Sequence, residues 1–153
     1  SLTNTRYLSL RDSTSLALSW RTAVIAPYGA TDVIPLQERY FNGGETTVRS
    51  FTRNALGPKD QNGNPLGGEV WNVFNAELRQ RIVGSFRVAA FVDAGNLLLN
   101  AGDWGFDDMR YGVGVGLRYM LPIGPIRFDF GWNPDKRPDE DQWAAHLAIG
   151  YPF

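Results

Sequence analysis

The sequence contains no cysteine and only one histidine among its 153 residues. Without cysteine the chain can form neither a disulfide nor a thiolate metal site, and a cysteine nucleophile is excluded. His146 lies among alanines, so a metal site or a catalytic base there would lack companion residues, and a hydrogen-bonding role is favoured. Fifteen basic residues nearly balance sixteen acidic ones, which leaves no electrostatic basis for nucleic-acid binding or for a polybasic membrane-surface patch.

A long hydrophobic run is also missing. No window approaches the run of about 18 apolar residues that a membrane-spanning helix needs. By contrast, the seventeen glycines and the aromatic content of 13% are high, and a β-barrel stays open because its alternating strands are only weakly hydrophobic. The chain starts at Ser1 without an initiator methionine or the features of a signal peptide, so we interpret residues 1–153 as one segment of a longer protein.

Alternation of apolar and polar residues predicts seven β-strands. In each strand, aliphatic and aromatic residues on one face oppose polar, charged or glycine residues on the other. The predicted strands cover residues 4–11, 15–25, 72–82, 86–93, 110–121, 126–132 and 143–153. Most of them approach the length of a tilted membrane-crossing strand and carry tyrosine or tryptophan near their ends. This favours an all-β, antiparallel transmembrane β-barrel over a soluble β-sandwich, whose strands average about five or six residues.

Short and long connections alternate along the chain. The short links are 12–14, 83–85 and 122–125, and the long ones are 27–68, 94–109 and 133–141. Barrels have short periplasmic turns and long extracellular loops, which predicts that the loop 27–68 is extracellular. With seven antiparallel strands, the first and the last run in the same direction and cannot close the sheet by antiparallel pairing. Either the chain is part of a larger barrel, which we favour, or an eighth strand lies within the long loop, at Val33 to Tyr40.

Four short motifs follow one another along the chain. They are Val48-Arg49-Ser50-Phe51 in the long loop, Phe91-Val92-Asp93-Ala94-Gly95 on a strand, Pro122-Ile123-Gly124-Pro125-Ile126-Arg127 at a turn, and an aromatic terminal strand. In this order they resemble the BamA/TamA-type superfamily of outer-membrane barrels. The resemblance implies the C-terminal part of a sixteen-strand barrel whose long extracellular loop folds back into the lumen. It also implies upstream strands and POTRA domains, which residues 1–153 do not include.

Arg49 is the predicted anchor of the loop. Alternation places Glu77 and Asp93 on the polar face, which a barrel turns toward its lumen, and a planar guanidinium can bind two carboxylates at once. In the family that the chain resembles, the matching arginine contacts an acid on the preceding strand and the aspartate of the motif that holds Phe91 and Gly95 here. The alternative is a solvated Arg49, with the two acids paired instead to Arg79, Arg81 or Arg87.

Ser50 stands where the family has glycine. If that position requires a positive φ, serine carries a steric cost. Gly112, Gly114 and Gly116 face the lumen by alternation, and they either leave room for the loop or let the sheet curve. They lack the spacing and the strand-to-helix setting of a phosphate loop.

The terminal strand is the predicted functional edge. Trp143, Tyr151 and Phe153 share its apolar face, so the chain would end on an outward aromatic. Gly150 would let the strand bend inward, and a proline at the next position but one cannot donate to a sheet ladder. In the family this strand borders a lateral seam in the barrel. The alternative is an ordinary last strand that closes the barrel.

Taken together, the resemblance implies an insertion or assembly factor that is an integral β-barrel of the bacterial outer membrane. Its implied partners are unfolded outer-membrane protein substrates, outer-membrane lipid, and periplasmic lipoproteins or chaperones, and not nucleic acid. No serine has a histidine and a carboxylate arranged around it, so we predict no enzyme, no cofactor and no metal. The alternatives are a two-partner-secretion type polypeptide transporter, a passive structural barrel and a soluble β-sandwich binding module.

Overall fold

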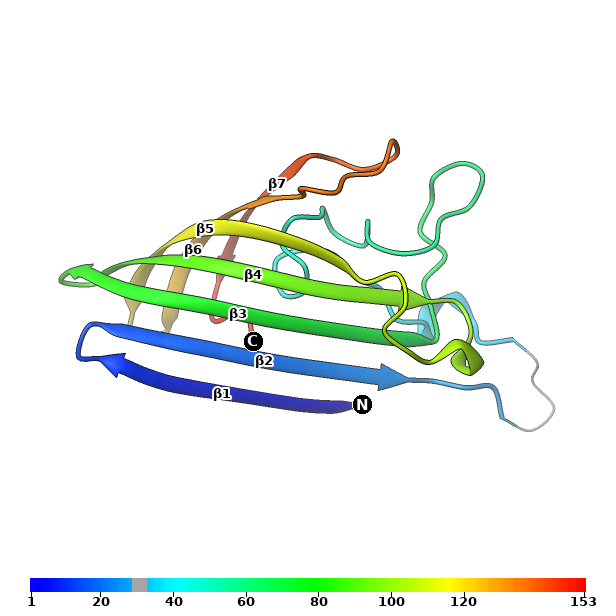
Figure 1. Ribbon diagram of the computed structural model, residues 1–153, viewed down its shortest axis with the longest axis horizontal. Coiled ribbons are helices and arrows are strands. Elements are labelled where there is room, and N and C mark those ends of the chain that lie inside the picture. The colour runs from blue at the N-terminus through cyan, green and yellow to red at the C-terminus, as the bar shows by residue number, and fades with distance from the viewer. Residues whose placement is uncertain (29–32) are drawn as a thin grey trace.

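The computed structural model describes residues 1–28 and 33–153, which form one antiparallel β-sheet with long loops at one end (Figure 1). Seven strands lie side by side in chain order. They are β1 Leu2–Arg11, β2 Thr14–Val24, β3 Val70–Val83, β4 Phe86–Leu98, β5 Arg110–Leu121, β6 Gly124–Trp132 and β7 Trp143–Ile149. Two single 3₁₀ turns, η1 Leu36–Glu38 and η2 Ala101–Asp103, lie in the loops. Within the described ranges, no helix has the length and hydrophobicity to cross a membrane.

Each strand pairs with the next along a ladder, so residues of like parity stack on the same face. One face carries rows such as Leu18, Ala76, Val92 and Val113. The opposite face carries rows such as Ala17, Glu77, Phe91 and Gly114. The predicted all-β, antiparallel fold with seven strands is confirmed, and the sheet is open rather than closed.

The two faces of the sheet have opposite chemistry. On the outer face, large apolar side chains are uncovered: Val92 is 52% exposed, Val115 60% and Leu147 76%. On the inner face, toward which the sheet curves (Figure 1), charged side chains such as Glu77 and Asp93 are fully buried. A soluble sandwich buries its apolar faces against each other, whereas a membrane barrel turns its apolar band outward. The described residues form a single sheet with an uncovered apolar face, which does not support the β-sandwich alternative.

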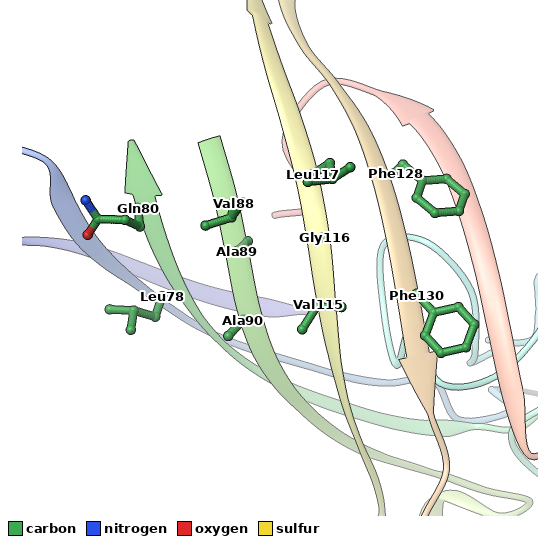
Figure 2. A pocket seen from close by; sticks show the side chains of 10 residues that line it. All are labelled: Leu78, Gln80, Val88, Ala89, Ala90, Val115, Gly116, Leu117, Phe128 and Phe130. Carbon is green, nitrogen blue, oxygen red and sulfur yellow. The ribbon is translucent and has the colours of Figure 1, made fainter. Parts of the chain in front are cut away.

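The outer face is hollowed across β3 to β6. Figure 2 shows Leu78 and Gln80 at one border of the hollow and Phe128 and Phe130 at the other. Shorter side chains lie between them, from Val88, Ala90, Val115 and Leu117. The hollow measures about 510 Å³ and its lining is almost wholly apolar. Such a surface is complementary to lipid acyl chains and not to water.

The long segment between β2 and β3 folds back against the inner face. Its two limbs are joined by isolated bridges, Tyr40 with Gly68 and Asn42 with Leu56. A small core seals it to the sheet, formed by Val48, Phe51, Leu56 and Leu97. The teal part of the ribbon in Figure 1 follows this path beside β7. The predicted loop 27–68 includes residues 29–32, which lie outside the described residues.

Several predicted boundaries are corrected. β4 continues to Leu98, so Gly95 and Asn96 lie in a strand and not in a loop. β7 ends at Ile149 and does not reach Phe153. The reason is Gly150, whose φ of +99° takes the chain out of the extended conformation. The eighth strand suggested at 33–40 is also wrong, since the described part of the loop there contains η1 and only a single bridge at Tyr40.

Candidate functional site

The guanidinium of Arg49 binds the carboxylate of Asp93 with a two-point fork. Nε donates to Oδ2 at 2.8 Å and Nη2 donates to Oδ1 at 2.9 Å. The backbone N–H of Arg49 donates to the same Oδ2 at 3.0 Å. Both side chains are fully buried. Asp93 therefore fixes the loop tip through its side chain and its main chain together, in the planar geometry that suits arginine.

The remaining Nη1 of Arg49 donates to Glu77 Oε2 and lies 3.8 Å from Asp129 Oδ2. Glu77 also accepts from Arg79 Nε at 2.6 Å and from Arg118 Nη2 at 3.1 Å. Arg118 Nη2 lies 2.6 Å from Asp129 Oδ1, which is ion-pair distance without hydrogen-bond alignment. The loop arginine thus joins an ionic network that spans β3 to β6. Removing one partner from a buried ionic network leaves the others uncompensated, which costs about 3–5 kcal/mol.

Two further groups hold the arginine in position. The Phe91 ring lies below the guanidinium, with its centroid 3.6 Å from Cζ, which adds a cation–π interaction. Asn75 Nδ2 donates to Asp93 Oδ1 at 2.8 Å and to the Thr47 carbonyl at 2.7 Å. Burial lowers the pKa of Arg49, but the hydrogen bond and charge of Asp93 and the charge of Glu77 outweigh it and raise the pKa above its usual value. Arg49 is therefore a permanent cation.

Glycines on the strands make room for the loop. A Cβ on Gly112 would overlap the Cβ and Oγ of Ser50, and a Cβ on Gly131 would overlap the Arg49 carbonyl and come 2.8 Å from the Ser50 Cα. A Cβ on Gly95 would come 2.9 Å from the Val48 side chain. These positions keep the sheet surface flat enough for the loop backbone to lie directly on it.

The other two predicted glycines serve different neighbours. Gly114 lies beneath the Phe91 ring, and Gly116 lies beneath Asp129 and Arg118. They accommodate the network below the loop and do not touch the loop itself. Gly131, which does touch it, was missed by sequence reasoning, although alternation on β6 places it on the inner face.

Ser50 does not adopt a positive φ, since the only non-glycine residues in that region among those described are Asn54 and Asp108. Serine at this position therefore carries no steric cost from its backbone conformation. The side chain is fully buried, and its Oγ has no hydrogen-bond partner among the described residues. Ser50 is thus limited by the space around its side chain and by the cost of burying a hydroxyl without a partner, and not by its backbone geometry.

His146 on β7 closes the far side of the site. Its Nε2 lies 3.1 Å from the Arg49 carbonyl, so a donating tautomer satisfies that buried oxygen. Asn42, also missed from the sequence, fastens the root of the loop by donating to the Asn96 carbonyl at 3.1 Å. The alternation of polar and apolar residues along β7 places His146 on the inner face, which agrees with the hydrogen-bonding role expected from the sequence. Asn42 lies in irregular structure, so no such pattern identifies it.

The residues after β7 turn inward. The Tyr151 and Phe153 rings lie 5.2 and 5.9 Å from the Arg79 guanidinium, and Phe153 is 6.0 Å from that of Arg49. Tyr7 on β1 donates to the Phe153 carbonyl at 2.9 Å. The expected outward aromatic end is therefore wrong, because the turn at Gly150 reverses the parity beyond it. Trp143 does face outward, 58% exposed and stacked on Phe130 at 5.6 Å.

At the long-loop end, the link between β6 and β7 closes over the folded loop. Arg110 forms a second fork, donating to Glu140 Oε1 at 2.6 Å and Oε2 at 2.8 Å. Burial raises the pKa of Glu140, but the hydrogen bonds from Arg110 and from the Arg137 backbone outweigh it, so the pKa lies below its ordinary value of 4.5. Among the described residues, no cluster of histidine and carboxylate side chains could hold a metal ion.

Comparisons with known proteins agree with this architecture. The family model described as the Omp85 superfamily domain matches residues 1–153. The outer membrane protein assembly factor BamA of Neisseria meningitidis is 24% identical over 97% of this chain, and that of Nitratidesulfovibrio vulgaris 27% over 84%. Sorting and assembly machinery component 50 homolog A of Xenopus laevis is 29% identical over 63%.

The chain spans 23%, 17% and 20% of the lengths of these three relatives. Among solved structures, BamA from Haemophilus ducreyi lacking POTRA domains 1–3 superposes with a TM-score of 0.74 at 22% identity. That match covers 92% of this chain and 32% of the other. The structural likeness concerns the fold.

Proposed function

The chain belongs to the Omp85 superfamily, and from this premise we propose that it is the gate-bearing part of an outer-membrane barrel that assembles other barrel proteins into the membrane. The single observation that carries the proposal is the binding of Arg49 to Asp93 through a fork and to Glu77 through Nη1, which fastens a long loop inside the curved sheet. Two of the relatives are named as outer membrane protein assembly factors.

We infer that the short turns face the periplasm and the long loops face the outside, as in other membrane barrels. The fastened loop then enters the lumen from the extracellular side and braces β3 to β7 from within. Its bracing is rigid because the contacts are buried ions and backbone atoms lying on glycines. A passive barrel needs no such brace, since strand closure alone stabilises it.

β7 is the element at which we place the seam. It is the shortest of the described strands, with seven residues, and Gly150, which follows its last residue, has a positive φ. β7 lies at an edge of the described sheet, and a short edge strand can pair with an incoming strand by β-augmentation. Arg49 in the folded loop contacts this strand through His146, so a movement of the loop would also shift the edge strand. In this mechanism unfolded outer-membrane proteins are the substrates and the surrounding lipid receives them.

Polypeptide secretion through the lumen is the competing function. The folded loop occupies the space that a translocating chain would need, and its buried contacts would have to break for each passage. This supports insertion at the seam over conduction through the pore. Periplasmic lipoproteins or chaperones remain proposed partners of the longer protein, and no step of covalent chemistry is assigned to the chain.

The test is reconstitution of the full-length protein in liposomes, with folding of an added barrel substrate followed by its heat-modifiable gel mobility. Arg49→Ala is expected to slow assembly at least tenfold, and Arg49→Lys, which keeps the charge but not the fork, to recover only part of the rate. Arg53→Ala, a change in the same loop outside the ionic network, is the matched control. Assembly at the parental rate in Arg49→Ala would refute the role of the brace.

A further inference from the structure

Four arginines stand in one row across four neighbouring strands. The ladder pairs Arg81 on β3 with Arg87 on β4, Arg87 with Arg118 on β5, and Arg118 with Arg127 on β6. All four lie on the inner face, and like charges directly opposite one another destabilise a sheet. Neighbouring strands are about 4.8 Å apart, so the row is about 14 Å long.

The row is undercompensated by acids. Glu77 and Asp129 are shared among Arg49, Arg79, Arg118 and Arg127. Among the residues that the structure describes, no carboxylate lies within ion-pair distance of Arg81 or Arg87. Beyond its two ends the row meets Ser13, whose carbonyl accepts from the Arg81 backbone, and Ala148, which pairs with Arg127. Neither neighbour supplies a negative charge.

Several guanidinium N–H groups in the row are buried without a partner. Arg118 and Arg127 are only 4% and 2% exposed, yet the Nε of each lacks an acceptor, as does the Nε of Arg87. Arg79, next to the row, has an unpartnered Nη2. Burying a charged donor without an acceptor is expensive. Within the described part of the chain, four buried donors without a partner thus belong to this row and to Arg79 beside it.

We propose that the arginine row is a binding site for an extended, acidic polypeptide segment. Along an extended chain, alternate side chains point the same way about 6.6 Å apart, so three alternating acids span about 13 Å, close to the length of the row. Arg87, which forms no ion pair with the described residues, can then offer its guanidinium to one carboxylate. Arg118 and Arg127 already bind Glu77 and Asp129 through Nη atoms, so each can donate from its free Nε. The row lies near the short turns 84–85 and 122–123, and the inference that its ligand arrives from the periplasm rests on the proposed function. The anion site itself rests only on the row.

The experiment is fluorescence anisotropy with the full-length protein in detergent micelles. The probe is a fluorescein-labelled hexapeptide with glutamate at alternate positions, and its twin carries glutamine instead. The glutamate peptide is expected to bind at least tenfold more tightly, and more weakly at raised salt, because the contacts are ionic. Equal binding of the two peptides would overturn the proposal.

Arg87→Gln is the diagnostic variant, because this half-buried side chain forms no ion pair whose loss would unfold the barrel. This variant is expected to bind the glutamate peptide about tenfold more weakly, which corresponds to the loss of one charge-assisted hydrogen bond. Arg87→Lys is expected to restore most of the affinity. Arg6→Gln is the matched control, since Arg6 is exposed and pairs with Leu18 on the outer face. Unchanged binding in Arg87→Gln would refute the site.

A competition arm tests the ligand class. Inorganic phosphate is expected to displace the peptide only at far higher concentration than unlabelled glutamate peptide does. If phosphate competes as well as the peptide, the row is a general anion site and the polypeptide assignment fails. Because binding is measured directly, these outcomes are independent of whether the protein assembles barrel substrates.

Discussion

Ser50 and Gly112 are interlocked, and this contact can be tested by paired substitutions. A Cβ placed on Gly112 would overlap both the Cβ and the Oγ of Ser50, whereas its next neighbour, the Trp132 carbonyl, is 3.3 Å away. The added methyl group thus meets the loop and little else. Overpacking of this kind typically costs about 1–3 kcal/mol, so we expect Gly112→Ala to destabilise the docked loop by that amount.

Ser50→Gly removes both overlapping atoms and also a buried hydroxyl without a partner. The stability of the double variant Ser50→Gly/Gly112→Ala should therefore lie within about 0.5 kcal/mol of that of Ser50→Gly alone. Independent substitutions add to within about this amount. Gly102→Ala is the control, because nothing lies within 4 Å of the Cβ position there.

The assay is thermal unfolding of the full-length protein in detergent, followed by gel mobility, with protease cleavage of the long loop as a local probe. Loss of protease protection in Gly112→Ala and its return in the double variant would support the interlock. If the two single effects simply add in the double variant, the loop does not lie on Gly112 and the geometry is refuted.

Three further predictions follow from the same contacts. Gly131→Ala should also destabilise the docked loop, because the added methyl group meets the Arg49 carbonyl and the backbone of position 50. Ser50→Gly leaves these backbone atoms in place and should not restore the stability. A restored melting temperature in the double variant would contradict this. Asp93→Asn should cost about 3–5 kcal/mol, because it leaves the buried Arg49 with one carboxylate fewer, and a change below about 1 kcal/mol would argue against the fork. Because the folded-state pKa of Glu140 is depressed, its stabilising contact is complete above pH 4.5 and is lost as the pH falls through the depressed value. In the parent protein, protease cleavage of the link 133–142 should therefore become faster as the pH falls through this window. In Glu140→Gln the cleavage should be fast at every pH.

Much of the fold follows from sequence patterns. Period-two alternation predicts seven strands, their antiparallel order and the face on which the side chains lie within the observed strands. The expected family, barrel fold and outer-membrane localisation are confirmed. Alternation works here because each strand separates an apolar surface from a polar one, so a register error would place charges on the apolar face.

Other features depend on information that one strand does not contain. Asp129 joins the Arg49 network only because the turn between β5 and β6 sets its register against Arg118. The arginine row likewise exists only once three successive turns align four strands. The inward position of Tyr151 does not follow from alternation, because the positive φ of Gly150 takes the chain out of the extended conformation and shifts the parity of the residues after it.

The claim that Arg49 fastens the loop inside the curved sheet is tested most directly by the chemical accessibility of its neighbour. Val48 is fully buried beside Arg49, and residues 1–153 contain no cysteine to interfere. In a full-length protein without other cysteines, a maleimide should label Val48→Cys slowly while Arg49 is present and at least tenfold faster once Arg49→Ala is added. Equal labelling rates in the two backgrounds would contradict the claim.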